Sequence, residues 1–312
     1  FSNETFVFKL TEKNYNSDLV LRLAPTGYRV FPEYNLKKQV SIMKALFSKG
    51  LPVPEVLFYE GNSSIIGSEF YIMNYIKGEA PSDNPPYHLD PDGMMGRADS
   101  EKRRNVWIDW LFHLSNLHNL DLKDINLDDF SEDDINRNPI ISDIEYYKNF
   151  LDWGMDGEPN NLCDDVINWL KKNIPSDSNP NKLCWGDSRL GNVLYQDYKA
   201  SALLDWEMSS IGDPISDLAW GFAVDDASSL GLGIKKLEGS LTSREAIDIW
   251  EKNTNLSSKN YKFYRIFSLL KFSIIMIRVA KKLVINNIIE LEKDFYKNNY
   301  ISNFLEKEFK EI

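Results

Sequence analysis

"LCWGDSRLGNVLYQ", residues 183–196, is the most informative segment of this sequence. An apolar, strand-like start leads into a polar link that carries Asp187, Arg189 and Asn192, and the strand-like "VLYQ" follows. A carboxylate, a guanidinium and an amide on one short loop are typical of a catalytic loop, because chemistry concentrates on loops that a rigid scaffold holds. Taken alone, the segment is explained equally well as a polar turn, since Asp and Asn favour turns.

The spacing to the next segment favours catalysis. Asn192 follows Asp187 by five residues, and Asp205 ends the apolar "ALLDWE" thirteen residues further on. Protein kinases use the same parts: an Asp that takes the acceptor proton, an Asn that binds Mg²⁺, and a carboxylate after the next strand that holds the metal on the phosphates. Mg²⁺ prefers such hard oxygen ligands. Asp and Asn five apart are common by chance, but much less so in combination with this second segment.

Composition limits the possible partners. The chain has 312 residues, of which 43% are hydrophobic and 27% charged, as in ordinary globular proteins. Its net charge of −11 argues against nucleic acid or an anionic membrane as the main partner, because both are polyanions. The most apolar segment, residues 266–285, is interrupted by four basic side chains, which argues against a spanning helix. The sequence leaves the oligomeric state open.

The cysteines suggest a cellular location for the protein, and the first residues suggest how its sequence begins. The two cysteines form neither a metal-binding spacing nor a disulfide framework, so a reducing cytoplasm is the simplest location. No signal peptide is visible. Because the sequence begins without Met, we expect further residues before Phe1.

Residues 1–76 read as a small antiparallel sheet with one helix. Residues 4–10 and 18–23 are rich in apolar strand formers and flank a polar link, which predicts a hairpin. Residues 33–50 predict a helix that ends before Gly50. Its expected apolar face consists of Leu36, Val40, Met43 and Phe47. Two further strands are expected at residues 55–60 and 68–76.

The remainder, residues 77–312, is rich in helix patterns. Four helices are expected, at residues 100–120, 161–173, 242–253 and 260–283. Short strands are expected at residues 182–185, 193–196 and 201–206, and the last two would form a hairpin. The fold class is therefore α+β, with a β-rich N-terminal part and a helical C-terminal part.

The central motif resembles a known family. "LCWGDSRLGNVLY" and "ALLDWEMSSIGDPISDLAW" are similar to the aminoglycoside phosphotransferase (APH), or kinase-like, superfamily. In particular they resemble the kinase-like domain found beside acyl-CoA dehydrogenase domains. The resemblance covers nearly the whole chain. It implies a protein-kinase-like fold with an N-lobe over residues 1–76 and a C-lobe over residues 77–312 that carries the catalytic loop and the acceptor site.

The resemblance implies roles for the residues of the central motif. Asp187 would be the catalytic base, and Asn192 and Asp205 would bind Mg²⁺. Glu207 would either join the metal ligands or only orient them. Arg189, inside the catalytic loop, would contact the substrate or brace the loop.

The resemblance also implies a site for ATP or GTP. Arg22 stands where kinases use lysine, and a guanidinium there still binds phosphates, in bidentate fashion. Ser2 would donate a hydrogen bond to a phosphate. Asn74 and Ile76 would offer main-chain hydrogen bonds to the adenine or guanine base of the nucleotide, and Met73 would be the gatekeeper residue in front of them.

Two departures from the family pattern leave an alternative open. Trp185 replaces the histidine that usually precedes Gly-Asp, and it would brace the loop by packing. Gln39 stands where the helix usually carries the glutamate partner of the phosphate-binding base, here Arg22. The favoured function is a Mg²⁺-dependent phosphotransferase that moves the γ-phosphoryl group of ATP or GTP to a hydroxyl of a small molecule. A hydroxy acid or hydroxyacyl-CoA is favoured over an aminoglycoside as the acceptor. The alternative is a nucleotide-binding pseudokinase with a regulatory role.

Overall fold

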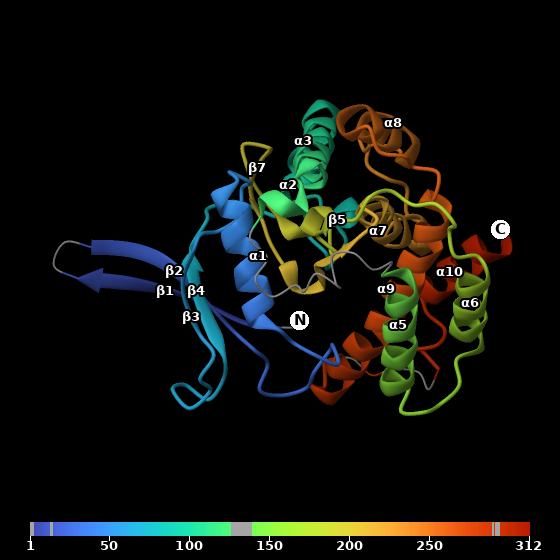
Figure 1. Cartoon of the computed structure of the whole chain (residues 1–312), viewed down its shortest axis with the longest axis horizontal. Helices are drawn as coiled ribbons and strands as arrows, with labels where there is room; N and C mark the ends of the chain where they lie inside the picture. Colours follow the sequence, from blue (N-terminus) through green and yellow to red (C-terminus); the bar gives the residue numbers. More distant parts are fainter. Residues whose placement is uncertain (1–2, 13–14, 126–138, 289, 291–293) are drawn as a thin grey trace.

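A computed structural model describes residues 3–12, 15–125, 139–288, 290 and 294–312 of the chain (Figure 1). The N-terminal part contains one four-stranded antiparallel sheet with the order β1-β2-β4-β3. Its strands are β1 (Glu4–Glu12), β2 (Tyr15–Leu23), β3 (Val56–Glu60) and β4 (Phe70–Asn74). The predicted N-terminal sheet is confirmed.

The β1–β2 hairpin is longer than the sequence pattern predicts. Its strands pair from Glu4 with Leu23 as far as Glu12 with Tyr15, so residues expected in the link are part of the ladder. Only residues 19–23 of β2 also pair with β4. The outer half of the hairpin therefore projects from the sheet, as Figure 1 shows.

Helix α1 (Leu36–Ser48) packs against β3 and β4. The Asn35 side chain caps its first turn by accepting from the Lys38 N–H. Leu36, Val40 and Met43 are buried as predicted. Phe47 is a correction: in the last turn it is 46% exposed, and its neighbour Leu46 is the buried residue instead.

The C-terminal part is helical, and the four predicted helices are present. Its helices are α2 (Met94–Arg97), α3 (Ser100–Asn119), α5 (Ile140–Gly154), α6 (Asn161–Lys172), α7 (Ile215–Ala227), α8 (Ser243–Thr254), α9 (Tyr261–Ile285) and α10 (Tyr300–Lys310). Helix α9, with 25 residues, contacts α5, α6, α7 and α10. Helices α2, α5, α7 and α10 lie outside the four predicted segments. Within the described part of the chain, no helix is both long enough and apolar enough to cross a membrane.

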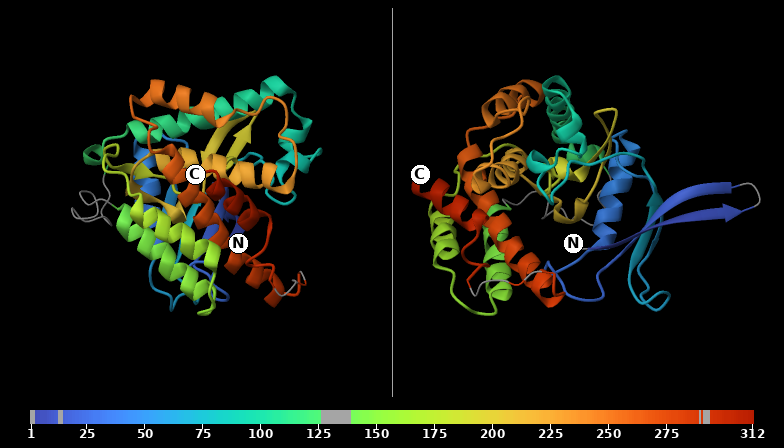
Figure 2. Two further views of the ribbon diagram at one scale, coloured as in Figure 1. Left: turned by 90° about the vertical axis from the view of Figure 1, so that its right-hand side faces the viewer. Right: turned by 180° about the vertical axis from the view of Figure 1, so that it is seen from behind.

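Two small strand pairs lie between the sheet and the helices. β5 (Lys182–Cys184) pairs with β8 (Ser210–Gly212), and β6 (Val193–Gln196) pairs with β7 (Lys199–Leu203). Figures 1 and 2 place the β6–β7 hairpin at the centre, with the four-stranded sheet on one side and the helices on the other. The expected α+β architecture, with a β-rich N-terminal part and a helical C-terminal part, is confirmed, whereas the lobe boundary at residue 76 stays a prediction.

The register of the β6–β7 hairpin brings two predicted metal ligands together. Val193 pairs with Leu203, and the Leu204 N–H donates to the main-chain oxygen of Asn192 at 2.8 Å. Asn192 and Asp205 therefore flank the same end of the hairpin. The predicted strand 201–206 ends earlier, at Leu203, because Asp205 has a left-handed backbone with φ of 55° that breaks the ladder.

Candidate active site

The expected catalytic loop follows β5 through a turn that only glycine fits. Gly186 has φ of +85°, and a Cβ at this position would lie 2.0 Å from the main-chain oxygen of Met208. The buried carboxylate of Asp217 accepts the main-chain N–H groups of Trp185, at 2.6 Å, and of Gly186, at 2.8 Å. The loop is thus held from behind by helix α7.

A buried histidine orients this carboxylate. His118 of α3 is fully buried, and its Nδ1 accepts the indole N–H of Trp250 at 2.9 Å. Its Nε2 is then the nitrogen left to donate to Asp217, at 3.1 Å. His118 therefore supports the catalytic loop and lies away from the position of a general base.

We expect Gly186→Ala to abolish activity and to lower stability by several kcal/mol. A left-handed backbone costs a non-glycine residue roughly 1–2 kcal/mol, and the clash with the Met208 oxygen adds to it. Gly67→Ala is the matched control, because Gly67 has φ of +89° and no atom within 4 Å of the added Cβ. Urea denaturation of both variants checks the prediction. Equal losses in the two would show that the contact with Met208 is unimportant.

Trp185 braces the loop by packing, as its replacement of histidine suggests. Its ring stacks on Trp206, with 5.4 Å between the centroids and an interplanar angle of 22°. Its indole N–H donates to the main-chain oxygen of Leu204 at 2.8 Å. The tryptophan therefore ties the start of the catalytic loop to the segment that carries Asp205.

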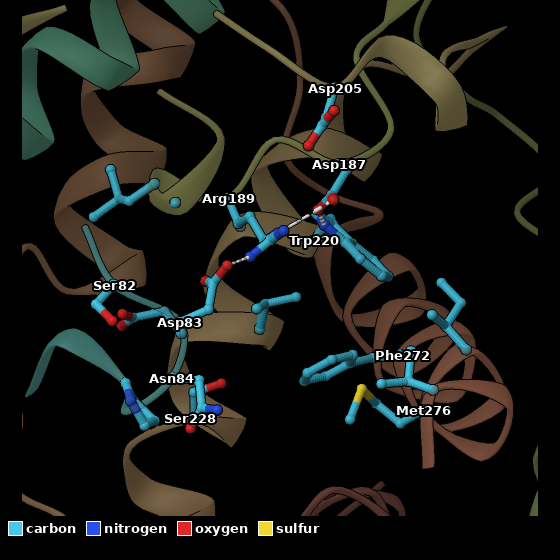
Figure 3. A pocket seen from close by; sticks show the side chains of 18 of the residues that line it. Ser82, Asp83, Asn84, Asp187, Arg189, Asp205, Trp220, Ser228, Phe272 and Met276 are labelled. Carbon is cyan, nitrogen blue, oxygen red and sulfur yellow. Dashed lines mark hydrogen bonds and ion pairs between the residues drawn. The ribbon is translucent and has the colours of Figure 1, made fainter. Parts of the chain in front are cut away.

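Asp187 lies at the centre of a polar cluster (Figure 3). Its Oδ1 accepts the indole N–H of Trp220 at 2.7 Å, and Arg189 Nε lies 3.2 Å from both of its carboxylate oxygens. The Asn192 amide donates to the Asp187 main-chain oxygen at 2.9 Å. The guanidinium of Arg189 also pairs with Asp83. The structure thus brings together the three polar residues of the loop, and it adds Trp220 and Asp83, which sequence analysis missed.

Arg22 and Asp205 form an ion pair of 2.7 Å across the site. Burial would raise the pKa of Asp205, but Arg22 holds it below its usual value, so Asp205 is a carboxylate at neutral pH. Gln39 of α1 is buried and carries no charge. The carboxylate that neutralises Arg22 among the described residues is therefore Asp205 itself.

Glu207 belongs to η4 (Trp206–Met208), immediately after Asp205. The side-chain amide of Asn3 donates to its Oε2 at 3.2 Å, so the N-terminal segment reaches the expected metal site. Asn3 is another residue that sequence analysis missed. Ser2, its neighbour, lies outside the described residues, and its phosphate contact stays a prediction.

The donor set fits magnesium. Among the described residues, no group of three or more His, Cys, Asp or Glu side chains is placed to hold a metal by itself. Asp205 and Glu207 nevertheless offer two neighbouring carboxylates, and Asn192 lies at the same hairpin end. Mg²⁺ is commonly bound in this way, by one or two carboxylates together with substrate phosphates and water.

The segment that is expected to bind the nucleotide base follows β4. Met73 is buried in this strand. The main-chain N–H of Asn74 donates to the Glu55 oxygen at 3.0 Å, so it is already engaged. Ile76 lies beyond the strand, and its main-chain N–H has no acceptor among the described residues. A main-chain N–H that donates to a nucleotide base at this position would therefore be that of Ile76.

A cavity of about 430 Å³ opens beside the catalytic loop. Asp187, Asp205 and Glu207 line one end of it. The apolar wall is formed by α7 and α9 with Trp220, Val224, Phe272, Ile275, Met276 and Val279. A third side comes from residues 82–88, the polar segment that follows the N-terminal sheet. Figure 3 shows Phe272 and Met276 projecting from α9 toward the space beside Asp187 and Trp220.

The sequence matches the model of a known protein family. The model of the phosphotransferase enzyme family (APH) matches residues 1–248. The chain belongs to this phosphotransferase family. Its solved relatives in fold include a putative aminoglycoside phosphotransferase from Ralstonia eutropha JMP134, with a TM-score of 0.70 and 18% identity, covering 99% of this chain and 93% of that one. A choline kinase from Streptococcus pneumoniae has a TM-score of 0.59 and 15% identity, covering 98% and 90%.

Curated relatives point to the expected branch of the APH family. Acyl-CoA dehydrogenase family member 11 of Gallus gallus is 27% identical over 300 residues, which cover 92% of this chain and 36% of that protein. Member 11 of Rattus norvegicus is 29% identical over 226 residues, which cover 70% and 26%. Member 10 of Mus musculus is 28% identical over 300 residues, which cover 90% and 26%. The chain thus spans about a quarter to a third of the length of these relatives.

Proposed function

We propose that this APH-family protein is a Mg²⁺-dependent small-molecule kinase, which moves the γ-phosphoryl group of ATP or GTP to an acceptor hydroxyl. The observation that carries the proposal is the position of Asp187, at the end of the 430 Å³ cavity that Asp205 and Glu207 also line. A carboxylate base beside two possible metal ligands, at the end of a cavity, suits transfer to a molecule that fits the cavity.

The side chains of the site divide the work of phosphoryl transfer. Asp187 accepts the proton of the acceptor hydroxyl, with its carboxylate oriented by Trp220. Arg22 and Arg189 bind phosphate oxygens and neutralise charge that builds up during transfer. Mg²⁺ would be held by Asn192, Asp205 and the neighbouring carboxylate of Glu207. When bound, it supplies charge neutralisation on the phosphates.

The cavity favours an acceptor with a carbon chain. The side chains along α9 follow helical spacing and present an apolar wall next to the carboxylates. A polycationic aminoglycoside would place ammonium groups against this wall at a desolvation cost. Arg189 also lines the cavity, but Asp187 and Asp83 already pair with it, so the choice of acceptor rests on the apolar wall. A hydroxy acid or hydroxyacyl-CoA therefore fits better, in keeping with relatives that belong to the acyl-CoA dehydrogenase family.

Calorimetric titration with ATP and with GTP, each with and without Mg²⁺, tests the donor. We expect one nucleotide to bind at least tenfold more tightly with Mg²⁺. Transfer of radiolabelled γ-phosphate to hydroxy acids of increasing chain length, with an aminoglycoside for comparison, tests the acceptor. Binding of nucleotide without transfer to any acceptor or to water would favour a pseudokinase, for which the replacement of the usual glutamate by Gln39 is the supporting observation. Absence of nucleotide binding would refute both.

A further inference from the structure

A half-buried lysine lies in the middle of the long apolar helix α9. Its Nζ lies 5.0 Å from the ring centroid of Trp220, 5.4 Å from that of Tyr147 and 5.6 Å from that of Phe267. This residue is Lys271, and the proposed function assigns it no role. An ammonium group over the faces of aromatic rings is attracted to them, and partial burial strengthens this attraction. The rings of Trp220, Tyr147 and Phe267 are therefore held in place around the Lys271 ammonium.

The most consequential of these neighbours is Trp220. One side of its indole faces the Lys271 ammonium, and its Nε1–H donates to Asp187 Oδ1 at 2.7 Å. Trp220 also lines the acceptor cavity, with Phe272 packed edge-on against it at 6.1 Å between centroids. The indole ring thus connects the Lys271 ammonium to the proposed catalytic base, and Figure 3 shows Trp220 beside Asp187.

Lys271 also lies behind the catalytic loop. A second, small cavity of about 30 Å³ is lined by Lys271, Gly186 and Asp217, together with Asp143, Cys184 and Asp213. Such a polar space has room for about one water molecule. Asp217 is the carboxylate that accepts the loop amides of Trp185 and Gly186. The two side chains that hold the loop, Trp220 and Asp217, therefore both border Lys271.

We propose that Lys271 is a positioning residue for phosphoryl transfer. Its ammonium fixes the Trp220 indole, and the indole in turn holds the Asp187 carboxylate in the orientation that receives the acceptor proton. This inference rests on the proposed role of Asp187 as the base. It predicts that replacing Lys271, which does not line the acceptor cavity, slows the chemical step and leaves nucleotide binding unchanged.

The contact is tested first without any turnover. In protein labelled with ¹⁵N at tryptophan, the Trp220 indole resonance is assigned by its loss in Trp220→Phe. We expect Lys271→Met to shift this resonance and to speed its exchange with solvent, and Lys271→Arg to restore much of the wild-type position. Lys262→Met is the matched control, because Lys262 is an exposed lysine of the same helix. An unchanged Trp220 resonance in Lys271→Met would overturn the inference.

The kinetic test uses Mg²⁺–ATP with water as the acceptor. We expect Lys271→Met to lower kcat on the order of tenfold to a hundredfold, the scale for a misplaced catalytic group, with KM for ATP within twofold of wild type. Trp220→Phe keeps an aromatic ring but lacks the indole N–H, and we expect a similar loss. The double variant should then lose no more than either single one. Multiplying losses, or a normal kcat in Lys271→Met, would contradict the inference.

The two tests separate this inference from the proposed function. Wild-type protein that turns over neither ATP nor GTP would refute the proposed function, while the Trp220 resonance would still report whether Lys271 fixes the indole. Thermal unfolding of each variant shows whether it is folded. If Lys271→Met does not fold, the comparison of Lys271→Arg and Trp220→Phe with wild type takes its place, and normal kcat in Trp220→Phe would then overturn the inference.

Discussion

Asp187→Asn is expected to lower kcat by roughly a thousandfold or more while the fold and nucleotide binding survive. An amide has nearly the shape of the carboxylate and still accepts the Trp220 indole N–H, but it cannot take the proton of the acceptor hydroxyl. General base catalysis contributes about 10²–10⁴-fold, which sets the scale of the loss. Steady-state kinetics and calorimetric titration with nucleotide measure the two effects separately.

Asp83→Asn is the matched control for this variant. Asp83 also pairs with Arg189, so its replacement removes a carboxylate from the same guanidinium without removing the base. We expect a much smaller loss of kcat than in Asp187→Asn. Wild-type turnover in Asp187→Asn, or equal losses in the two variants, would show that Asp187 is not the base.

Asp205→Asn is expected to abolish Mg²⁺-dependent nucleotide binding and also to destabilise the protein. The change removes a proposed metal ligand and leaves the Arg22 guanidinium, whose side chain is only 11% exposed, without its carboxylate. Loss of one partner of a buried pair costs about 3–5 kcal/mol, and the partial exposure of Asp205 reduces this to about 1–3 kcal/mol. Urea denaturation measures the stability, and calorimetry with and without Mg²⁺ measures the binding.

The double variant Arg22→Gln/Asp205→Asn separates the two effects. Without the guanidinium no unpaired charge remains, so we expect stability to return toward the wild-type value while Mg²⁺-dependent binding stays lost. If the double variant is as unstable as Asp205→Asn, the ion pair is not the source of the instability.

The same ion pair predicts a pH dependence of stability. Because Arg22 holds the pKa of Asp205 below its ordinary value of 3.8 in the folded protein, the pair contributes stability above about pH 4. This contribution is lost as the pH falls through the lower pKa of the folded state. The difference in unfolding free energy between wild type and Asp205→Asn should therefore be largest at neutral pH and shrink below pH 4.

Predictions of where residues lie are confirmed where the signal is local, whereas the roles of the site residues stay predictions. Asp187, Asn192 and Asp205 lie on one loop and the hairpin that follows it, and the Val193–Leu203 register alone brings the last two side by side. The N-terminal sheet and the main helices follow from apolar periodicity. Predictions at element ends were less reliable. Phe47 is exposed although it shares the spacing of buried residues, because burial in a last turn depends on what packs there.

The sequence by itself, through its resemblance to the family, determined the family of the chain and its kinase-like architecture. It also predicts which residues form the catalytic loop, because these residues lie close together in the sequence. Tertiary structure alone decided what surrounds them. Asn3 meets Glu207 across 204 residues, and Asp83 meets Arg189 across 106. Nothing local distinguishes Trp220 from the other seven tryptophans as the partner of Asp187. Such contacts arise only when packed helices bring distant segments together, and the packing depends on the whole chain.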